Sequence, residues 1–265
     1  MKKILVIGTG GTIACVKNKS IRLDNPFKII DYCKKDGVEF DCISPFSVLS
    51  ENLSLEHWQI LIDCISSVDF GNYLGAIILH GSDTLAFTGA LLGNIFYDKS
   101  IVITASDKPL EDKTANGVFN FQAAVDFLEN GINGVFISYD KLYRGTKTVS
   151  ANENDEFITS GTHGKIITSP RLVHKNILII RPYVGINYNN YNINGVDAVL
   201  HTMYHSATAP KNTLEFIEKC KNNNVAFYFV TTKSSADYES AKDYDSIIFN
   251  STLENAYAKL LLTNQ

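Results

Sequence analysis

The stretch ILVIGTGGTIA at residues 4–14 decides the fold. It begins with four apolar residues, rich in β-branched side chains, and continues into a loop with three glycines and two threonines. A short apolar run of this kind is typical of a buried strand in a parallel sheet. Open α/β sheets bind their ligands beyond the carboxyl ends of such strands. Glycines let backbone N–H groups approach a bound group, so the loop predicts either a phosphate cradle or a nucleophilic threonine beside oxyanion donors.

Length and composition limit the number of domains and the kinds of partner. The chain has 265 residues, 45% of them hydrophobic and 20% charged, as is ordinary for a soluble globular protein. At about 150 residues per domain, this length allows one large domain or a large and a small one. The net charge of -4 and the pI of about 5.9 argue against a nucleic-acid partner. No apolar run approaches the roughly 20 residues of a membrane-spanning helix, so we expect no membrane partner.

The cysteines indicate the compartment. All five are scattered and none forms a CxxC pair: Cys15, Cys33, Cys42, Cys64 and Cys220. Such a pattern favours free thiols in a reducing compartment over a zinc site or a disulfide framework. The apolar run after Met1 is too short for an export signal. We therefore expect a cytoplasmic protein without a metal.

Strand-like and helix-like segments alternate along the chain. We expect strands at 38–43, 73–79, 100–104 and 135–139, helices at 26–35, 54–67, 85–96 and 115–128, and a hairpin segment at 142–149. After residue 164 further strands are expected at 177–180, 196–200, 225–230 and 246–249, with helices at 210–221 and 253–262. This alternation predicts an α/β fold. Residues 1–168 would form a larger catalytic domain with a doubly wound, mostly parallel sheet, and residues 169–265 a smaller α/β domain.

A second turn completes a chemical constellation. HGSDT at residues 80–84 follows a buried strand, and parallel strands bring both turns to one edge of the sheet. The two turns offer the hydroxyls of Thr9, Thr12, Ser82 and Thr84 and the carboxylate of Asp83. The basic segment RGTKT at 144–148 could add an amine. A hydroxyl nucleophile, a lysine base and an orienting carboxylate are the groups that acyl transfer requires.

These motifs resemble a known family. GTGGTIA and HGSDT are similar to GGTIA and HGTDT, the two signatures of bacterial-type L-asparaginases. TASDKPL at 104–110, the asparagines at 116 and 120, and LYRG at 142–145 resemble its cytoplasmic type I branch. The resemblance spans residues 1 to about 165 and is weaker over the C-terminal part. Ordered signatures at two strand ends are far more specific than one glycine loop.

The resemblance implies roles residue by residue. Thr12 matches the nucleophile that attacks a side-chain amide and expels ammonia, and Lys147 would be the base. Ser82 stands where the family has a second threonine, with Asp83 beside it. The implied substrate contacts are Gly11, Ser50, Glu51, Gly81, Ser82, Asp83 and Ser106. The family implies L-asparagine hydrolysis to aspartate and ammonia through an acyl-enzyme, without cofactor or metal. It also implies a homodimer or homotetramer with active sites shared between subunits.

The sequence departs from the family pattern at two places. No tyrosine occurs between Cys15 and Asp31, where the family's lid supplies one. The lysine has two readings: the string TKT assigns it to Lys147, whereas the register of LYRG assigns it to Ser150. We favour Lys147, because no other lysine lies nearby on the crevice side.

Two other functions stay open at this point. The chain could be a catalytically weakened relative that binds an amino acid or amide as a sensor or partner module. It could also be a nucleotide- or phosphate-binding domain, although GTGGT matches neither GxGxxG nor the Walker spacing. Within the enzyme hypothesis, the sequence does not choose between asparagine, glutamine, a D-isomer and a larger amide. Asp83 is also expected to cap the following helix, and His80 to be structural.

Overall fold

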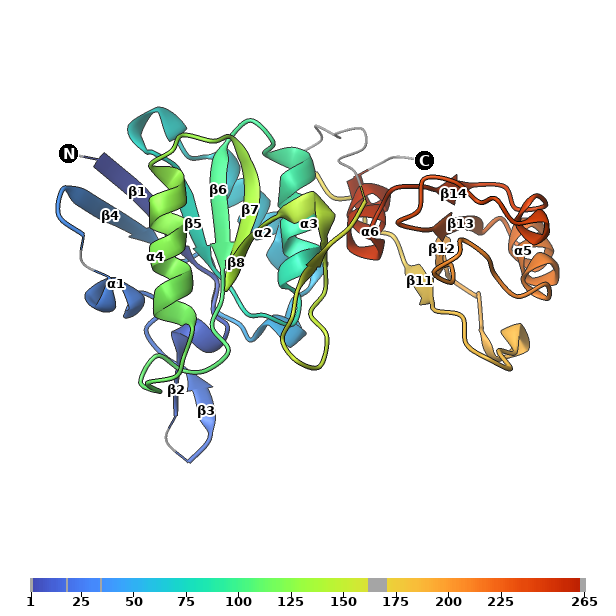
Figure 1. Cartoon of the computed structure of the whole chain (residues 1–265), viewed down its shortest axis with the longest axis horizontal. Helices are drawn as coiled ribbons and strands as arrows, with labels where there is room; N and C mark the ends of the chain where they lie inside the picture. Colours follow the sequence, from blue (N-terminus) through green and yellow to red (C-terminus); the bar gives the residue numbers. More distant parts are fainter. Residues whose placement is uncertain (1, 18, 34, 162–170, 263–265) are drawn as a thin grey trace.

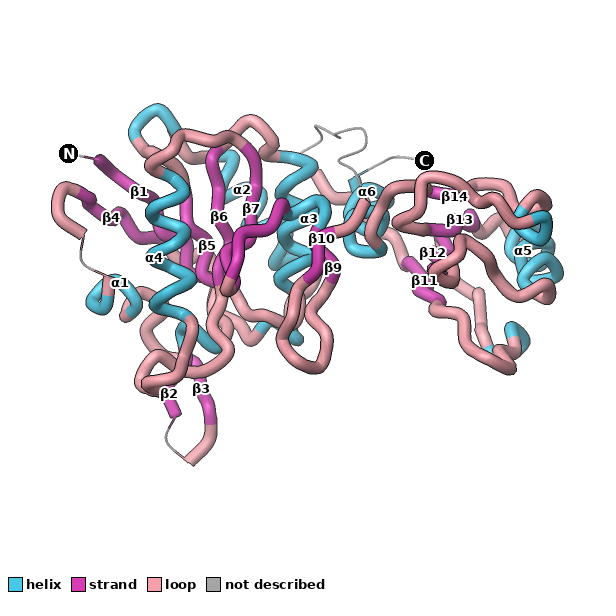
Figure 2. Tube along the Cα trace, viewed as in Figure 1, coloured by secondary structure: helices cyan, strands magenta, loops and turns pink. Residues whose placement is uncertain are grey.

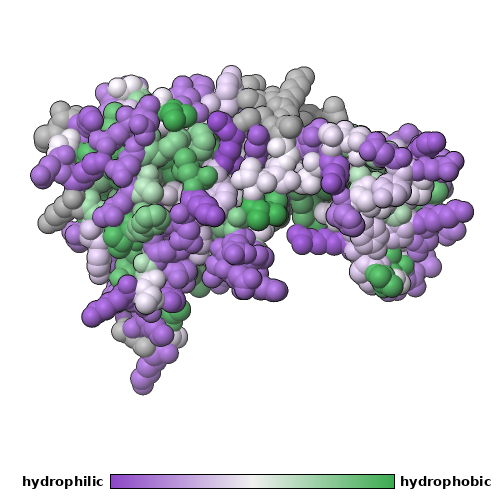
Figure 3. Space-filling model, in the orientation of Figure 1, coloured by the Kyte–Doolittle hydropathy of each residue, from purple (hydrophilic) through white to green (hydrophobic). Residues whose placement is uncertain are grey.

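The computed structural model describes residues 2–17, 19–33, 35–161 and 171–262. A larger and a smaller β-sheet lie beside one another, each with its own helices, and α6 (Leu253–Leu262) lies between them (Figure 1). Figure 2 separates the strands from the loops that join them. Hydrophilic side chains cover most of the face drawn in Figure 3, and the apolar patches are concentrated over the larger sheet's side. None of the described helices has the length and apolarity needed to cross a membrane.

The larger sheet has six strands in the order β4-β1-β5-β6-β7-β8. Its strands are β1 (Lys2–Gly8), β4 (Val38–Ile43), β5 (Ala76–Leu79), β6 (Ser100–Thr104), β7 (Gly134–Tyr139) and β8 (Lys141–Arg144). All neighbours pair in parallel except β8, which runs antiparallel to β7. The predicted doubly wound, mostly parallel sheet is therefore confirmed.

Helices cover both faces of this sheet. Successive side chains of a strand point to opposite faces, so Ile4 and Val6 pack on one side of β1 and Leu5 and Ile7 on the other. The first side carries α1 (Ile29–Tyr32) and α4 (Gly117–Leu128), and the second carries α2 (Leu55–Ser66) and α3 (Leu85–Ile95). Burial on both faces explains why the strands are continuous apolar runs.

The strand order places the ligand crevice. The chain leaves β1 for β4 on one side and then crosses to β5 on the other. Sheets of this order bind ligands where the direction reverses, beyond the carboxyl ends of the two flanking strands. Here those strands are β1 and β5, which are followed by the two turns at residues 9–12 and 80–84.

The smaller sheet is parallel throughout. Its order is β11-β12-β13-β14, from Ile177–Ile180, Ala198–Thr202, Ala226–Val230 and Ile247–Ile248. One face packs on α5 (Thr213–Asn222) and the other on α6. Because α6 also packs against α3, it belongs to the cores of both halves. The boundary expected at residues 168 and 169 lies outside the described residues.

Two local predictions need correction. The helix expected at 26–35 is limited to the single turn of α1. The expected hairpin at 142–149 is split: after β8, a 3₁₀ turn at Gly145–Lys147 leads to β9 (Thr148–Val149), which pairs with β10 (Ile158–Thr159). The turn packs against α3 instead of continuing the ladder. The segment after Thr12 forms a small hairpin of β2 (Cys15–Lys17) and β3 (Ile21–Leu23), which projects from the larger half (Figure 1).

The approach of this turn to α3 yields a stability prediction. A Cβ at Gly145 would lie 2.3 Å from the carbonyl oxygen of Gly89, a backbone atom that cannot move aside without moving α3. Gly145→Ala should therefore lower the free energy of unfolding by about 1–3 kcal/mol, as overpacking does. Urea unfolding measures it. Gly71→Ala is the control, because its nearest contact is the movable Asp69 carboxylate at 3.1 Å. Equal stability of the two variants would contradict this packing.

Candidate active site

Backbone hydrogen bonds join the loop after β1 to a second loop that ends at Ser50. The Gly11 N–H donates to the Val48 carbonyl, and the Val48 N–H donates to the Thr9 carbonyl, both at 3.0 Å. Gly10 and Gly11 have φ values of +109° and +74°, a region that L-residues with a Cβ avoid. The glycines of the first motif therefore serve the turn that holds these two loops together.

The loop after β5 packs directly on both. A Cβ at Gly11 would lie 2.4 Å from the Gly81 nitrogen, and a Cβ at Gly81 would lie 2.3 Å from the Ser50 hydroxyl oxygen. Only residues without side chains allow this approach. The structure thus brings together the loops that carry Thr12, Ser50 and Ser82, three of the residues named from the sequence.

The two threonines of the first loop are in different environments. Thr9 is buried, and its hydroxyl donates to the Leu79 carbonyl at 2.7 Å. Thr12 begins the 3₁₀ turn Thr12–Ala14 and is partly exposed. Across the part of the chain that the structure describes, no group hydrogen-bonds to the Thr12 hydroxyl. Thr12 therefore has the hydroxyl that is available to a ligand, whereas Thr9 holds the loop to β5.

Acidic and hydroxyl groups lie beside this loop. The buried Ser50 hydroxyl donates to Asp83 Oδ2 at 3.3 Å, and the Thr84 hydroxyl donates to the Ser50 carbonyl at 3.1 Å. The Asp83 and Glu51 side chains are exposed, and Ser82 is partly exposed.

The expectation that Asp83 caps α3 is wrong, because the N-cap residue is Thr84. The Asp83 carboxylate is held by Ser50 instead, and its other oxygen has no hydrogen-bond partner among the described residues.

Backbone donors complete the site. Among the described residues, no acceptor is found for the N–H groups of Thr12, Gly81, Ser82 and Asp83. The last three immediately precede α3, where the helix dipole adds positive potential. Unpaired N–H groups of this kind stabilise a carboxylate or a developing oxyanion. The crevice therefore combines anion-binding donors with exposed carboxylates.

The lysine is not joined to these groups. Lys147 is partly exposed in the 3₁₀ turn, and no hydrogen bond or ion pair between described residues links its amine to Thr12, Ser82 or Asp83. Ser150, the other position considered, donates its N–H to Glu254 Oε1 at 2.9 Å. The Ser150 hydroxyl and Glu254 Oε2 are both buried, and neither has a partner within the described chain. Nothing local predicts the Glu254 contact, since the two residues are 104 positions apart.

Ser106 has a different environment from the other predicted contacts. It is fully buried, and its hydroxyl donates to the Lys108 carbonyl at 2.5 Å. A Cβ at Gly117, the first residue of α4, would lie 2.6 Å from that hydroxyl. In this arrangement Ser106 shapes the connection between β6 and α4, and a substrate contact would require its hydroxyl to leave Lys108.

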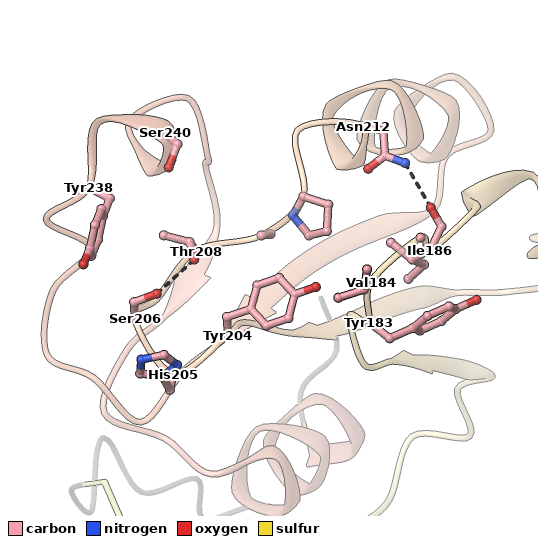
Figure 4. Close-up of a pocket in the computed structure, with 13 residues that line it drawn as sticks. Tyr183, Val184, Ile186, Tyr204, His205, Ser206, Thr208, Asn212, Tyr238 and Ser240 are labelled. Atoms are coloured by element: carbon pink, nitrogen blue, oxygen red, sulfur yellow. Dashed lines mark hydrogen bonds between the residues drawn. The ribbon is translucent and has the colours of Figure 1, made fainter.

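A separate cavity lies elsewhere in the described part of the structure. It has a volume of about 650 Å³, is in the C-terminal half, and is lined by residues from 183–186, 204–212 and 238–240 (Figure 4). The hydroxyls of Ser206 and Thr208, two residues of the lining, bond to one another, and the Asn212 amide donates to the Ile186 carbonyl at 3.1 Å. No Asp, Glu, Lys or Arg lines it. A zwitterionic amino acid would find no opposite charge there, so the crevice at β1 and β5 is the better candidate site.

No cluster of three or more His, Cys, Asp or Glu side chains suited to a metal occurs within the described ranges. All five cysteines are free thiols.

Comparison with known proteins identifies the class of protein to which this fold and this crevice belong. Residues 3–176 match the family model described as "Asparaginase, N-terminal". The chain therefore belongs to the asparaginase family, as the two signature motifs predicted.

Several curated relatives carry the name L-asparaginase, among them the following two. The protein from Thermococcus kodakarensis is 28% identical over 153 residues, which span 55% of this chain and 46% of that protein. L-asparaginase 1 of Escherichia coli is 26% identical over 248 residues, or 80% of this chain and 73% of the relative. The match to the first relative thus covers less than half of its length.

The three-dimensional likeness extends further along the chain. The crystal structure of L-asparaginase I from Vibrio cholerae superposes with a TM-score of 0.78 and 21% identity, covering 98% of this chain and 92% of that one. The likeness confirms the fold, including the C-terminal half where the sequence motifs are weak.

Two buried histidines give a pH prediction. His80 and His201 are almost completely buried, and burial lowers the pKa of each imidazole to about 4. In the unfolded chain these imidazoles bind protons below about pH 6.5, whereas in the folded protein they stay neutral down to about pH 4. Their contribution to the free energy of unfolding is therefore fully present above about pH 6.5 and is lost as the pH decreases toward 4. Each histidine should lower the free energy of unfolding by about 2 kcal/mol when the pH is lowered from 7 to 5. Urea unfolding at both pH values measures the loss.

His201→Gln separates the two contributions. It should remove about half of the loss between pH 7 and pH 5, because one of the two buried imidazoles, His80, remains. A wild-type stability that does not change over this range would contradict neutral, buried imidazoles.

Proposed function

We propose that the chain hydrolyses the side-chain amide of L-asparagine to L-aspartate and ammonia, with Thr12 as the nucleophile. The observation that carries the proposal is the convergence of three kinds of group at the ends of β1 and β5. They are an exposed carboxylate, a threonine hydroxyl and backbone N–H groups, and neither the hydroxyl nor the N–H groups have a partner among the described residues. Membership of the asparaginase family and the names of the relatives support the same activity.

The charges of the crevice suit an amino acid. Asp83 and Glu51 offer carboxylates to an α-ammonium group, and the Ser50 hydroxyl keeps Asp83 in place. The N–H groups of residues 81–83 offer donors to a carboxylate or a carbonyl oxygen. Two anionic side chains disfavour a phosphate in the same crevice, which argues against the nucleotide-binding alternative.

The chemistry follows from these groups. The Thr12 oxygen attacks the amide carbon while its proton passes to a base, and N–H donors stabilise the oxyanion that forms. The C–N bond then breaks, and the proton leaves with ammonia. Water attacks the resulting ester, gives its proton to the base, and releases aspartate and free Thr12. We assign the base to Lys147, with Ser82 relaying the proton during deacylation.

The resemblance also carries proposals on assembly and location. We propose a cytoplasmic homodimer or homotetramer, whose sites are completed by a neighbouring subunit. The five free thiols agree with a reducing compartment.

Thr12→Val tests the nucleophile. The side chain keeps its shape and loses the oxygen that forms the ester, so ammonia release from L-asparagine should fall at least about a thousandfold. Stabilisation of the variant by L-asparagine in a thermal-shift assay should remain, because the binding groups are intact. Wild-type turnover by Thr12→Val would remove the mechanism. Stabilisation of the wild type without any turnover would select the sensor alternative.

Lys147→Met tests the base. Loss of general-base catalysis should lower kcat by about a hundredfold or more. Lys141→Met is the matched control, because Lys141 is an exposed lysine of the adjacent strand β8. Unchanged turnover in Lys147→Met, together with higher turnover in Ser150→Lys, would move the base position to residue 150.

A further inference from the structure

A chain of buried side chains ends on the loop that carries Ser82. The Trp58 indole Nε1 lies 3.0 Å from the Thr88 hydroxyl, which lies 2.9 Å from His80 Nε2. His80 Nδ1 lies 2.8 Å from the carbonyl oxygen of Gly81. All three side chains are buried, so water does not compete for these bonds.

The direction of every bond in this chain is determined. The Gly81 carbonyl only accepts, so His80 Nδ1 carries the proton. A neutral imidazole has one N–H, so Nε2 accepts the Thr88 proton. The Thr88 oxygen in turn accepts the indole proton, because an indole N–H only donates. His80 is neutral in the folded protein, since burial lowers its pKa to about 4. Its Nδ1–H therefore donates a hydrogen bond to the Gly81 carbonyl, and the lone pair of its Nε2 is occupied by the Thr88 hydroxyl.

The Gly81 end of this hydrogen-bonded series lies at the contact between the loops that follow β1 and β5. Gly81 is wedged between Gly11 and the Ser50 hydroxyl, as their close approaches show. Because a trans peptide is planar, a Gly81 carbonyl turned toward His80 directs the Ser82 N–H the opposite way, away from the buried ring. That N–H has no acceptor in the described part of the protein.

We propose that Trp58, Thr88 and His80 are positioning residues, which fix the Gly81–Ser82 peptide so that the Ser82 N–H and hydroxyl face the reacting amide. The inference rests on the proposed function. It adds three residues from α2, α3 and the end of β5 that do not touch the substrate. Donors that are already in position stabilise a developing oxyanion without having to reorganise. A Gly81–Ser82 peptide that is no longer held in place should therefore lower kcat more than it changes KM.

Thr88→Val and Thr88→Ser test the role. Valine keeps the shape of threonine and breaks the chain at its centre, whereas serine keeps the hydroxyl. We expect kcat for ammonia release to fall at least tenfold in Thr88→Val with KM within threefold, and to stay within threefold of wild type in Thr88→Ser. All variants are compared at a temperature where circular dichroism shows them folded.

Tyr188→Phe is a matched control for the loss of a buried hydroxyl. Tyr188 bonds His201 Nε2 at 2.8 Å, and His201 Nδ1 bonds the carbonyl of the next residue, Thr202, as His80 bonds Gly81. The control therefore breaks the same kind of contact in the C-terminal half. It should lower the melting temperature and leave kcat unchanged. An equal loss of kcat in Tyr188→Phe and Thr88→Val would show a general effect of stability and overturn the positioning role.

Nitrogen-15 NMR of the imidazoles gives a readout besides activity. Wild-type His80 should be the Nδ1–H tautomer at pH 7, and an Nε2–H tautomer would overturn the proposal. Wild-type turnover that is retained in Thr88→Val would overturn the positioning role and leave the proposed function standing. A wild-type protein that releases no ammonia from L-asparagine would remove the proposed function and this role with it.

Discussion

The structure depends on the contact between the backbones of Gly11 and Gly81. A methyl group on either residue would overlap the opposite loop or Ser50 by more than 1 Å relative to ordinary contact distances. This contact brings the end of β1 against the end of β5, at the one place in the sheet where the strand order reverses. The Thr12 hydroxyl, the unpaired N–H groups and the Asp83 carboxylate are close together because these two strands end side by side.

A cluster of buried polar groups lies at the junction formed by α6. Asn94 on α3 bonds Asn255, and Glu254 accepts the N–H of Ser150 at the end of β9. Three of the four buried side-chain atoms without a partner in the described residues belong to this group: Asn94 Oδ1, Ser150 Oγ and Glu254 Oε2. Such atoms each cost about 1–3 kcal/mol. The first turn of α6 therefore links the C-terminal half to the residue that follows β9 through the hydrogen bond between Glu254 and Ser150.

Buried histidines occur at equivalent places in both halves. His80 follows β5, His201 lies in β12, and each bonds the carbonyl of the residue after it through Nδ1. Each Nε2 lies against a hydroxyl, from Thr88 in one case and Tyr188 in the other. Burial keeps both neutral, so each imidazole fixes the direction of one backbone carbonyl at the end of a parallel strand.

The sequence by itself determined the sheet and the two glycine turns at the carboxyl ends of β1 and β5. Apolar runs specify parallel strands because both faces of such a sheet are buried, and the glycine motifs specify the turns because only glycine fits them. Because these motifs specify the turns, the sequence could place Thr12, Ser82 and Asp83 at the ends of β1 and β5. Tertiary structure decided what depends on distant partners: α1 is a single turn, Ser106 turns inward to Lys108, and Ser150 meets Glu254. The Trp58–Thr88–His80 chain likewise joins three separate elements. Local patterns do not encode such contacts, because the packing of whole helices on the sheet sets which side chains meet.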